Sequence, residues 1–157
     1  MTTLVLVRHA KSDWGDPGLD DHDRPLNDRG LRDAPLLAAR LAATGFTPDA
    51  FLTSTALRAR TTARFFAAAL GVDADPREEL YGASARTLLS TAVAADAPNV
   101  MIVAHDPGMT MLAETLSRGG IPAMPTCAVA TFQWDTDDWD VASAIDPDTW
   151  DFDRPQR

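Results

Sequence analysis

Two short apolar runs, at positions 4–7 and 100–104, are each followed by a histidine. One arginine separates the first run from its histidine, and the second run is followed by its histidine directly. Uninterrupted runs of this length are typical of strands that are covered on both faces, as in a parallel sheet. Parallel strands need long crossover connections, usually helices, so the two runs favour an α/β fold. Open α/β sheets bind their ligands where the strands end, and His9 and His105 would lie at that edge.

Helix and strand signals alternate along the rest of the chain. The expected elements are helix 28–44, strand 49–54, helix 55–70, helices 84–98 and 106–118 around strand 99–106, and strands 126–135 and 139–145. The expected helix boundaries are N-caps at Asn27, at Ser54 or Thr55 and at Ser84, with stops at Gly45 and Gly71. This order predicts a three-layer α/β/α sandwich with a mostly parallel central sheet.

The length of the chain, 157 residues, is enough for one domain with a proper core, so we expect a single domain over residues 1–157. Its acidic end, 146–157, is expected to be loose, although Trp150 and Phe152 could dock. The net charge of -9 argues against nucleic acid or an anionic membrane as a partner, because both need a basic footprint. The first residues do not resemble a signal peptide and no run reaches the ~20 residues of a membrane span, so we expect a cytoplasmic protein.

Arginines accompany the strand-end histidines. Arg8 precedes His9, and Arg58 falls in the first turn of helix 55–70, where free N–H groups and the helix dipole favour an anion. Arg58 and Arg60 lie about 200° apart around a helix, so we assign Arg58 inward and Arg60 to solvent or packing. Such a cluster suits a tetrahedral dianion, since guanidinium forks match phosphate oxygens and neutral imidazole is a competent nucleophile.

Four segments together resemble, in the same order, the histidine phosphatase superfamily, in the branch that includes phosphoglycerate mutases. They are LVLVRHAKS, RPLNDRG, STALRARTTA and IVAHDPGM, and they span nearly the whole chain. The short length, the RPLN segment and the late PAMPTCAVATFQWD look most like the SixA-type phosphohistidine phosphatases. The resemblance implies a phosphoglycerate mutase-like fold, no cofactor, and a covalent phosphohistidine intermediate on His9. One departure is Ala10, where many members have glycine.

By matching position, the resemblance also implies a phosphate pocket of Arg8, Arg58 and His105, with Arg24 as a further ligand. No metal is expected, because arginines beside the histidines would repel a cation. His22, in the acidic loop before Arg24, is interpreted as a solvated histidine.

Family members that act on phosphate esters carry a carboxylic acid after the second helix. Glu79 is therefore a possible general acid and Glu78 the lesser candidate, although both could equally be solvated residues before a turn. Because His9 must be neutral to attack and His105 is most useful protonated, we expect a bell-shaped activity profile across about pH 5–8.

Phosphohistidine has less need of a general acid, because its P–N bond breaks readily and solvent can protonate the imidazole. The chain also lacks room for the insertions that cover the site of sugar-phosphate mutases. We therefore favour a metal-independent phosphatase acting on phosphohistidine in a protein. The alternative is a phosphatase of small phosphomonoesters, such as sugar or nucleotide phosphates. A non-catalytic phosphate- or phosphoprotein-binding module is less favoured, since binding alone would not require the nucleophile His9.

Overall fold

One sheet forms the middle layer of the protein in its computed structural model, which describes residues 1–156. Within that range the strands are β1 (Thr2–Arg8), β2 (Ala50–Ser54), β3 (Asp75–Arg77), β4 (Asn99–Ala104), β5 (Val129–Trp134) and β6 (Thr149–Asp153). The helices are α1 (Asp28–Ala43), α2 (Leu57–Leu70), α3 (Ala85–Ala95), α4 (Gly108–Leu116) and α5 (Trp139–Ala142), with short 3-10 turns η1 (Asp21–Asp23) and η2 (Glu78–Leu80). Between residues 1 and 156, none of these helices is long and apolar enough to cross a membrane.

The strand order across the sheet is β3-β2-β4-β1-β5-β6. The first four strands in this order run parallel to one another. β5 pairs antiparallel with β1, and β6 pairs antiparallel with β5. The β1–β4 pairing places Arg8 opposite Ala104. The residues that follow, His9 and His105, therefore leave the sheet at the same edge. This topology confirms the predicted mostly parallel sheet.

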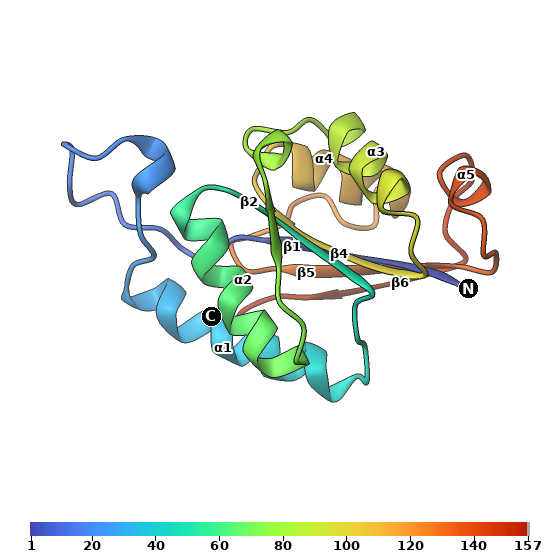
Figure 1. Ribbon diagram of the computed structural model, residues 1–157, viewed down its shortest axis with the longest axis horizontal. Helices are drawn as coiled ribbons and strands as arrows, with labels where there is room; N and C mark the ends of the chain where they lie inside the picture. Colours follow the sequence, from blue (N-terminus) through green and yellow to red (C-terminus); the bar gives the residue numbers. More distant parts are fainter. Residues whose placement is uncertain (157) are drawn as a thin grey trace.

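Helices cover the sheet on both faces, with α1 and α2 on one side and α3 and α4 on the other (Figure 1). The side chains of β1 alternate between the two layers, as the pleat of a strand requires. Val5 and Val7 belong to the core under α1 and α2, while Leu4 and Leu6 belong to the core under α3 and α4. All four are fully buried, which explains why this strand reads as one apolar run. The predicted three-layer sandwich is confirmed.

The helix boundaries largely follow the predicted caps. Asn27 accepts a hydrogen bond from the N–H of Gly30, and Ser84 accepts one from the N–H of Thr87. The prediction for α2 is wrong, because this helix has no side-chain cap. The hydroxyl of Ser54, one of its predicted caps, contacts the ring of His105 instead.

Two glycines allow helix starts to approach neighbouring backbone. A Cβ at Gly30, in the first turn of α1, would overlap the carbonyl oxygen of Lys11. A Cβ at Gly108, the first residue of α4, would overlap the carbonyl oxygen of Ala83. These contacts hold the loop after β1 and the loop before α3 close to the edge where the histidines emerge.

The structure corrects the predicted strand 139–145, because α5 occupies part of this segment. The ring of Trp139 is buried 5.9 Å from the ring of Trp134, and its Nε1 donates to the carbonyl of Ala97. The side chain of Asp138 caps the turn by accepting from the N–H of Asp140. Four residues are too few to reveal a helical period in the sequence.

The acidic end of the chain is also more ordered than predicted, since residues 149–153 form the edge strand β6. Phe152 packs against the core, and Arg40 of α1 donates to both carboxylate oxygens of Asp153, at 2.9 and 2.7 Å. The short strand β3 was not predicted either; its three residues are all exposed, so no apolar signal marks them. The last residue of the predicted tail, Arg157, lies outside the described residues.

Candidate active site

The two strand-end histidines meet at the carboxyl edge of the sheet. The backbone N–H of His9 donates to the carbonyl of Ala104 at 3.1 Å, which continues the β1–β4 pairing by one residue. The rings of His9 and His105 lie 5.1 Å apart between centroids, and the two residues are only 7% and 6% exposed. The structure therefore brings this predicted pair together in a buried position.

Each ring is oriented by one hydrogen bond. Nδ1 of His9 lies 2.7 Å from the carbonyl oxygen of Ala10. Because a carbonyl only accepts, Nδ1 carries the proton and Nε2 keeps the lone pair that a nucleophile needs. Nε2 of His105 lies 2.7 Å from the hydroxyl of Ser54.

Burial keeps both imidazoles neutral in the free protein. It lowers the pKa of His9 to about 3 against the opposing effect of the Ala10 carbonyl, with smaller contributions in the same direction as burial from His105, Arg58 and Arg8. Burial, followed by the positive charge of Arg58, lowers the pKa of His105 to about 4. The bell-shaped activity profile expected across pH 5–8 assumes histidines that titrate in that range, and the lowered pKa values of both rings argue against this assumption in the free protein. At neutral pH His9 is already in the form that can attack.

The buried nitrogens around this pair point to an anion. Within residues 1–156, the buried side-chain N and O atoms without a hydrogen-bond partner are Nε of Arg8, Nε of Arg58 and Nδ1 of His105. Buried polar groups are nearly always paired, so three orphan nitrogens among four residues predicted to form one site are unusual. A tetrahedral oxyanion supplies several acceptors at once and would pair with them.

Arg8 is held in place by a backbone carbonyl and a carboxylate, whereas Arg58 is placed by the start of α2. Nη1 of Arg8 donates to the carbonyl of Met124 at 2.9 Å and lies 3.5 Å from the carboxylate of Asp106. Arg58 is 6% exposed and occupies the first turn of α2, as predicted. Arg60 instead turns its Nε to the carbonyl of Thr55 at 2.8 Å.

Asp21, in the turn η1, joins the arginines into one network. Its carboxylate accepts from Nη2 of Arg58 at 2.9 Å, from Nε of Arg24 at 3.1 Å and from the hydroxyl of Tyr81 at 2.6 Å. These bonds, that of Tyr81 first, hold the pKa of Asp21 well below its usual range. Asp21 is therefore an anion at working pH and cannot donate a proton.

Arg24 is buried rather than solvated. Only 6% of the residue is exposed, and its Nη1 donates to the hydroxyl of Ser12 at 2.7 Å. The ring of Trp14 lies over its guanidinium, 3.4 Å from the carbon to the ring centroid, which is a cation–π contact. Its connection to Arg58 runs through Asp21.

An aromatic ring from the loop before α3 completes the cluster. Tyr81 packs edge-on against His105, with centroids 5.6 Å apart, and against His22 at 4.9 Å. Nε2 of His22 lies 2.8 Å from the hydroxyl of Thr55. The interpretation of His22 as a solvated histidine is therefore wrong; it is half-buried and helps to hold Tyr81.

Comparison with known families agrees with this geometry. The model of the histidine phosphatase superfamily, branch 1, matches residues 4–84. This chain belongs to the histidine phosphatase superfamily. An uncharacterized protein of Mycobacterium tuberculosis (strain H37Rv) is 42% identical over 115 residues, covering 71% of this chain and 70% of that protein. An uncharacterized chloroplastic protein of Arabidopsis thaliana is 30% identical over 166 residues, covering 94% and 73%.

Solved structures place this histidine phosphatase near SixA proteins. The SixA of Agrobacterium tumefaciens, which carries the provisional name phosphohistidine phosphatase, superposes with a TM-score of 0.82 at 32% identity over 98% of each chain. The protein histidine phosphatase SixA complexed with tungstate gives 0.74 at 23% identity, covering 85% of this chain and 89% of that one, and shows the shared fold. The fold is phosphoglycerate mutase-like, and the superfamily and its SixA neighbours support a phosphatase.

Glu79, the possible general acid, does not pack against the histidines of this phosphatase as Tyr81 does. It is exposed in η2, with its Oε1 3.6 Å from Nη1 of Arg77. Its side chain lines a separate cavity of about 460 Å³ together with residues of α3 such as Thr87. The neighbouring Glu78 is exposed as well. From this segment, the side chain that contacts His105 is that of Tyr81.

Asp21, Tyr81 and Ser54 are the site residues that the sequence did not reveal. Asp21 lies in an acidic run typical of solvated loops, and Tyr81 follows a turn without a motif. Ser54 was assigned to a helix cap. Within residues 1–156, no group of three or more His, Cys, Asp or Glu residues is arranged to hold a metal ion.

Proposed function

We propose that this histidine phosphatase removes phosphate from phosphohistidine in a protein, through a covalent phosphohistidine intermediate on His9 and without a metal ion. The observation that carries the proposal is the neutral His9 beside three orphan buried nitrogens of Arg8, Arg58 and His105. A nucleophile and a set of anion donors at one sheet edge are what phosphoryl transfer requires.

The first step is an in-line displacement at phosphorus. Nε2 of His9 forms a new P–N bond as the P–N bond to the substrate imidazole breaks, and solvent protonates the departing nitrogen. Arg8, Arg58 and His105 bind the phosphoryl oxygens that lie around the reaction axis. The dianion raises the pKa of His105, because an opposite charge favours the protonated form, so His105 becomes a further donor only when substrate is bound.

In the second step, water attacks phosphorus and the P–N bond to His9 breaks. Inorganic phosphate leaves, one proton of the attacking water passes to solvent, and His9 returns to its neutral form. Charge neutralisation by guanidinium groups replaces the role that Mg²⁺ has in other phosphoryl-transfer enzymes.

The choice of phosphohistidine over phosphate esters rests on the leaving group. An alkoxide needs a proton in the transition state, and a general acid is typically worth about 10²–10⁴-fold. Asp21 is a stable anion that accepts hydrogen bonds from three groups, so it has no proton to donate. Glu79 is paired with Arg77 and lines a separate cavity. An imidazole leaving group takes its proton from solvent. The likeness to the SixA of Agrobacterium tumefaciens supports the same choice.

A substrate panel with chelator tests the proposal. The purified protein is assayed on a histidine-phosphorylated protein, an aryl phosphate and a sugar phosphate, each with and without EDTA. We expect the phosphohistidine protein to be the best substrate and EDTA to have no effect. Preferential turnover of the sugar phosphate would favour the phosphomonoester alternative, and loss of all activity in EDTA would overturn the metal-independent pocket.

A further inference from the structure

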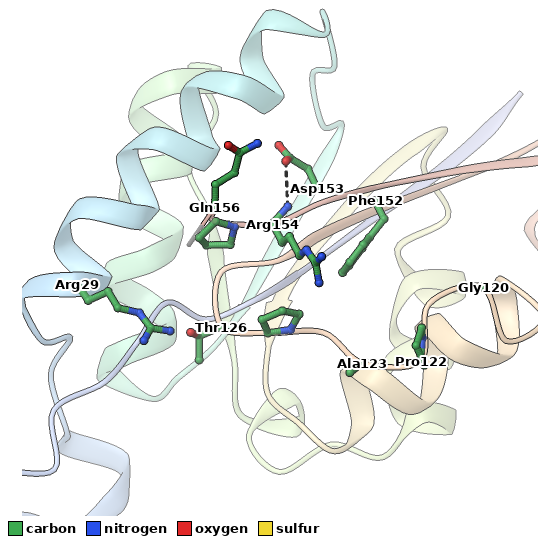
Figure 2. Close-up of a pocket in the computed structure, with 11 residues that line it drawn as sticks. Arg29, Gly120, Pro122, Ala123, Thr126, Phe152, Asp153, Arg154 and Gln156 are labelled. Carbon is green, nitrogen blue, oxygen red and sulfur yellow. Dashed lines mark hydrogen bonds between the residues drawn. The ribbon is translucent and has the colours of Figure 1, made fainter.

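A large hollow lies at the end of the sheet where α1 begins. Its volume is about 1030 Å³, and it is lined by Arg29 of α1, by the loop 120–126 and by residues 152–156 (Figure 2). Small-molecule sites usually have about 300–1,000 Å³, so this hollow lies slightly above that range and is large enough for several residues of a peptide.

The hollow shares a wall with the active site. The carbonyl of Met124 accepts a hydrogen bond from Arg8, and the N–H of Cys127 donates to the carbonyl of His9 at 3.0 Å. Thr126, between these two positions, lines the hollow. Adjacent Cα atoms are about 3.8 Å apart, so the hollow begins within about two residues of the His9 backbone.

The charge of the lining is positive. Arg29 and Arg154 contribute guanidinium groups, and the carboxylate among the lining residues, that of Asp153, is neutralised by two hydrogen bonds from Arg40. Nε of Arg29 forms an ion pair of 3.8 Å with the carboxylate of Asp33, one turn further along α1, so its charge is only partly neutralised. In a chain of net charge -9 this basic region is a local reversal that an acidic partner would recognise.

The lining also offers apolar contact between the two arginines. Figure 2 shows the ring of Phe152 beside the guanidinium of Arg154, while the guanidinium of Arg29 approaches Thr126 from the opposite wall. Prolines of the loop 120–126 and of the chain end add rigid apolar surface. Rigid apolar walls with charged groups at both ends suit an extended peptide better than a compact metabolite.

We propose that this basic hollow docks the acidic polypeptide segment that flanks the phosphohistidine of the substrate protein. Arg29 and Arg154 pair with its carboxylates while the phosphoryl group occupies the site at His9. The proposal rests on the function proposed above and adds the sequence context that the enzyme prefers. An extended chain advances about 3.3 Å per residue, so Asp or Glu within about four residues of the phosphohistidine reaches the hollow.

The test compares two synthetic peptides that carry one phosphohistidine, flanked by Glu in one and by Gln in the other. We expect wild type to favour the Glu peptide in kcat/KM by about 2- to 30-fold, as two partly exposed ion pairs allow. The double variant Arg29→Glu/Arg154→Glu should lose or invert this preference. The matched control Arg64→Glu/Arg86→Glu changes the net charge equally at exposed positions on α2 and α3, and should keep it.

Three results separate the two proposals. Equal cleavage of both peptides by wild type, or an unchanged preference in the Arg29→Glu/Arg154→Glu variant, overturns the docking site and leaves the phosphatase proposal intact. If neither peptide is cleaved while an aryl phosphate is, the phosphohistidine proposal fails. Docking is then decided by fluorescence anisotropy of the labelled, unphosphorylated Glu peptide, which should bind wild type and the control but not the Arg29→Glu/Arg154→Glu variant. Equal binding to all three proteins contradicts it.

Discussion

The two buried histidines should make the protein markedly less stable in mild acid. Their pKa values, about 3 for His9 and about 4 for His105, lie below the ordinary value of 6.5 because burial disfavours the charged ring. Below pH 6.5 the unfolded chain therefore binds protons that the folded protein does not. Stability falls as pH falls wherever the unfolded state binds more protons, so the loss begins near pH 6.5.

The size of this loss follows from the same values. Between pH 7 and pH 4.5, each histidine of the unfolded chain gains about 2 to 3 kcal/mol from protonation, while His9 and His105 in the folded protein gain almost nothing. The two together remove about 5 kcal/mol, which is comparable to the whole stability of many domains. Asp21 acts in the same direction only below about pH 4, since its pKa is lowered from the carboxyl range.

Urea denaturation at pH 7.0, 5.5 and 4.5 measures the effect. We expect the free energy of unfolding of wild type to fall steeply across this window. The variants His9→Asn and His105→Asn should each show about half of the fall, and the double variant should show little. A wild-type stability that is constant down to pH 4.5, or a double variant as pH-sensitive as wild type, would refute the reasoning.

Four further outcomes are expected. Because His9 is neutral above about pH 3, the acid limb of kcat/KM for the free enzyme should lie below pH 5, and a limb near pH 6.5 in a stopped-flow pH series would contradict the buried ring. Asp21→Asn leaves two buried guanidiniums with a weaker acceptor, so urea denaturation should show a loss of about 1–3 kcal/mol; an unchanged midpoint would mean that the network adds no stability. Glu79→Gln should keep most activity on phosphohistidine, and a loss of 10²-fold or more on that substrate would restore Glu79 as the acid. Gly30→Ala forces the loop after β1 away from α1, and thermal melting should show destabilisation of about 1–3 kcal/mol, which an unaltered melting temperature would exclude.

The sequence allowed the sheet and the histidine pair to be predicted because both depend on local patterns. A strand buried on two faces must be apolar throughout, so residues 4–7 and 100–104 marked adjacent parallel strands. Once these strands are neighbours, His9 and His105 must emerge together. Arg58 was assigned from helix geometry alone, since only one of two arginines two positions apart can face the sheet edge.

The parts that were missed depend on long-range contacts. Asp21 and Tyr81 are 60 positions apart in the sequence, and neither their residue types nor their spacing predicts that they form a hydrogen bond. Residues 149–153 look like a charged tail, but Arg40 holds Asp153 across 113 positions and Phe152 reaches the core. Glu79 is only a possible acid by resemblance to ester-cleaving family members. The structure presents it in η2 beside Arg77, and a few residues of local backbone decide which side chain meets the histidines.

Trapping of the phosphoenzyme tests the central claim most directly. Wild type and His9→Asn are mixed for milliseconds with a ³²P-labelled histidine-phosphorylated protein and denatured in alkali, which preserves P–N bonds, and the labelled peptide is sequenced. The account predicts wild-type label on His9 that is lost on brief acid treatment, and no label in His9→Asn. Label on another residue, or full turnover by His9→Asn, would contradict it.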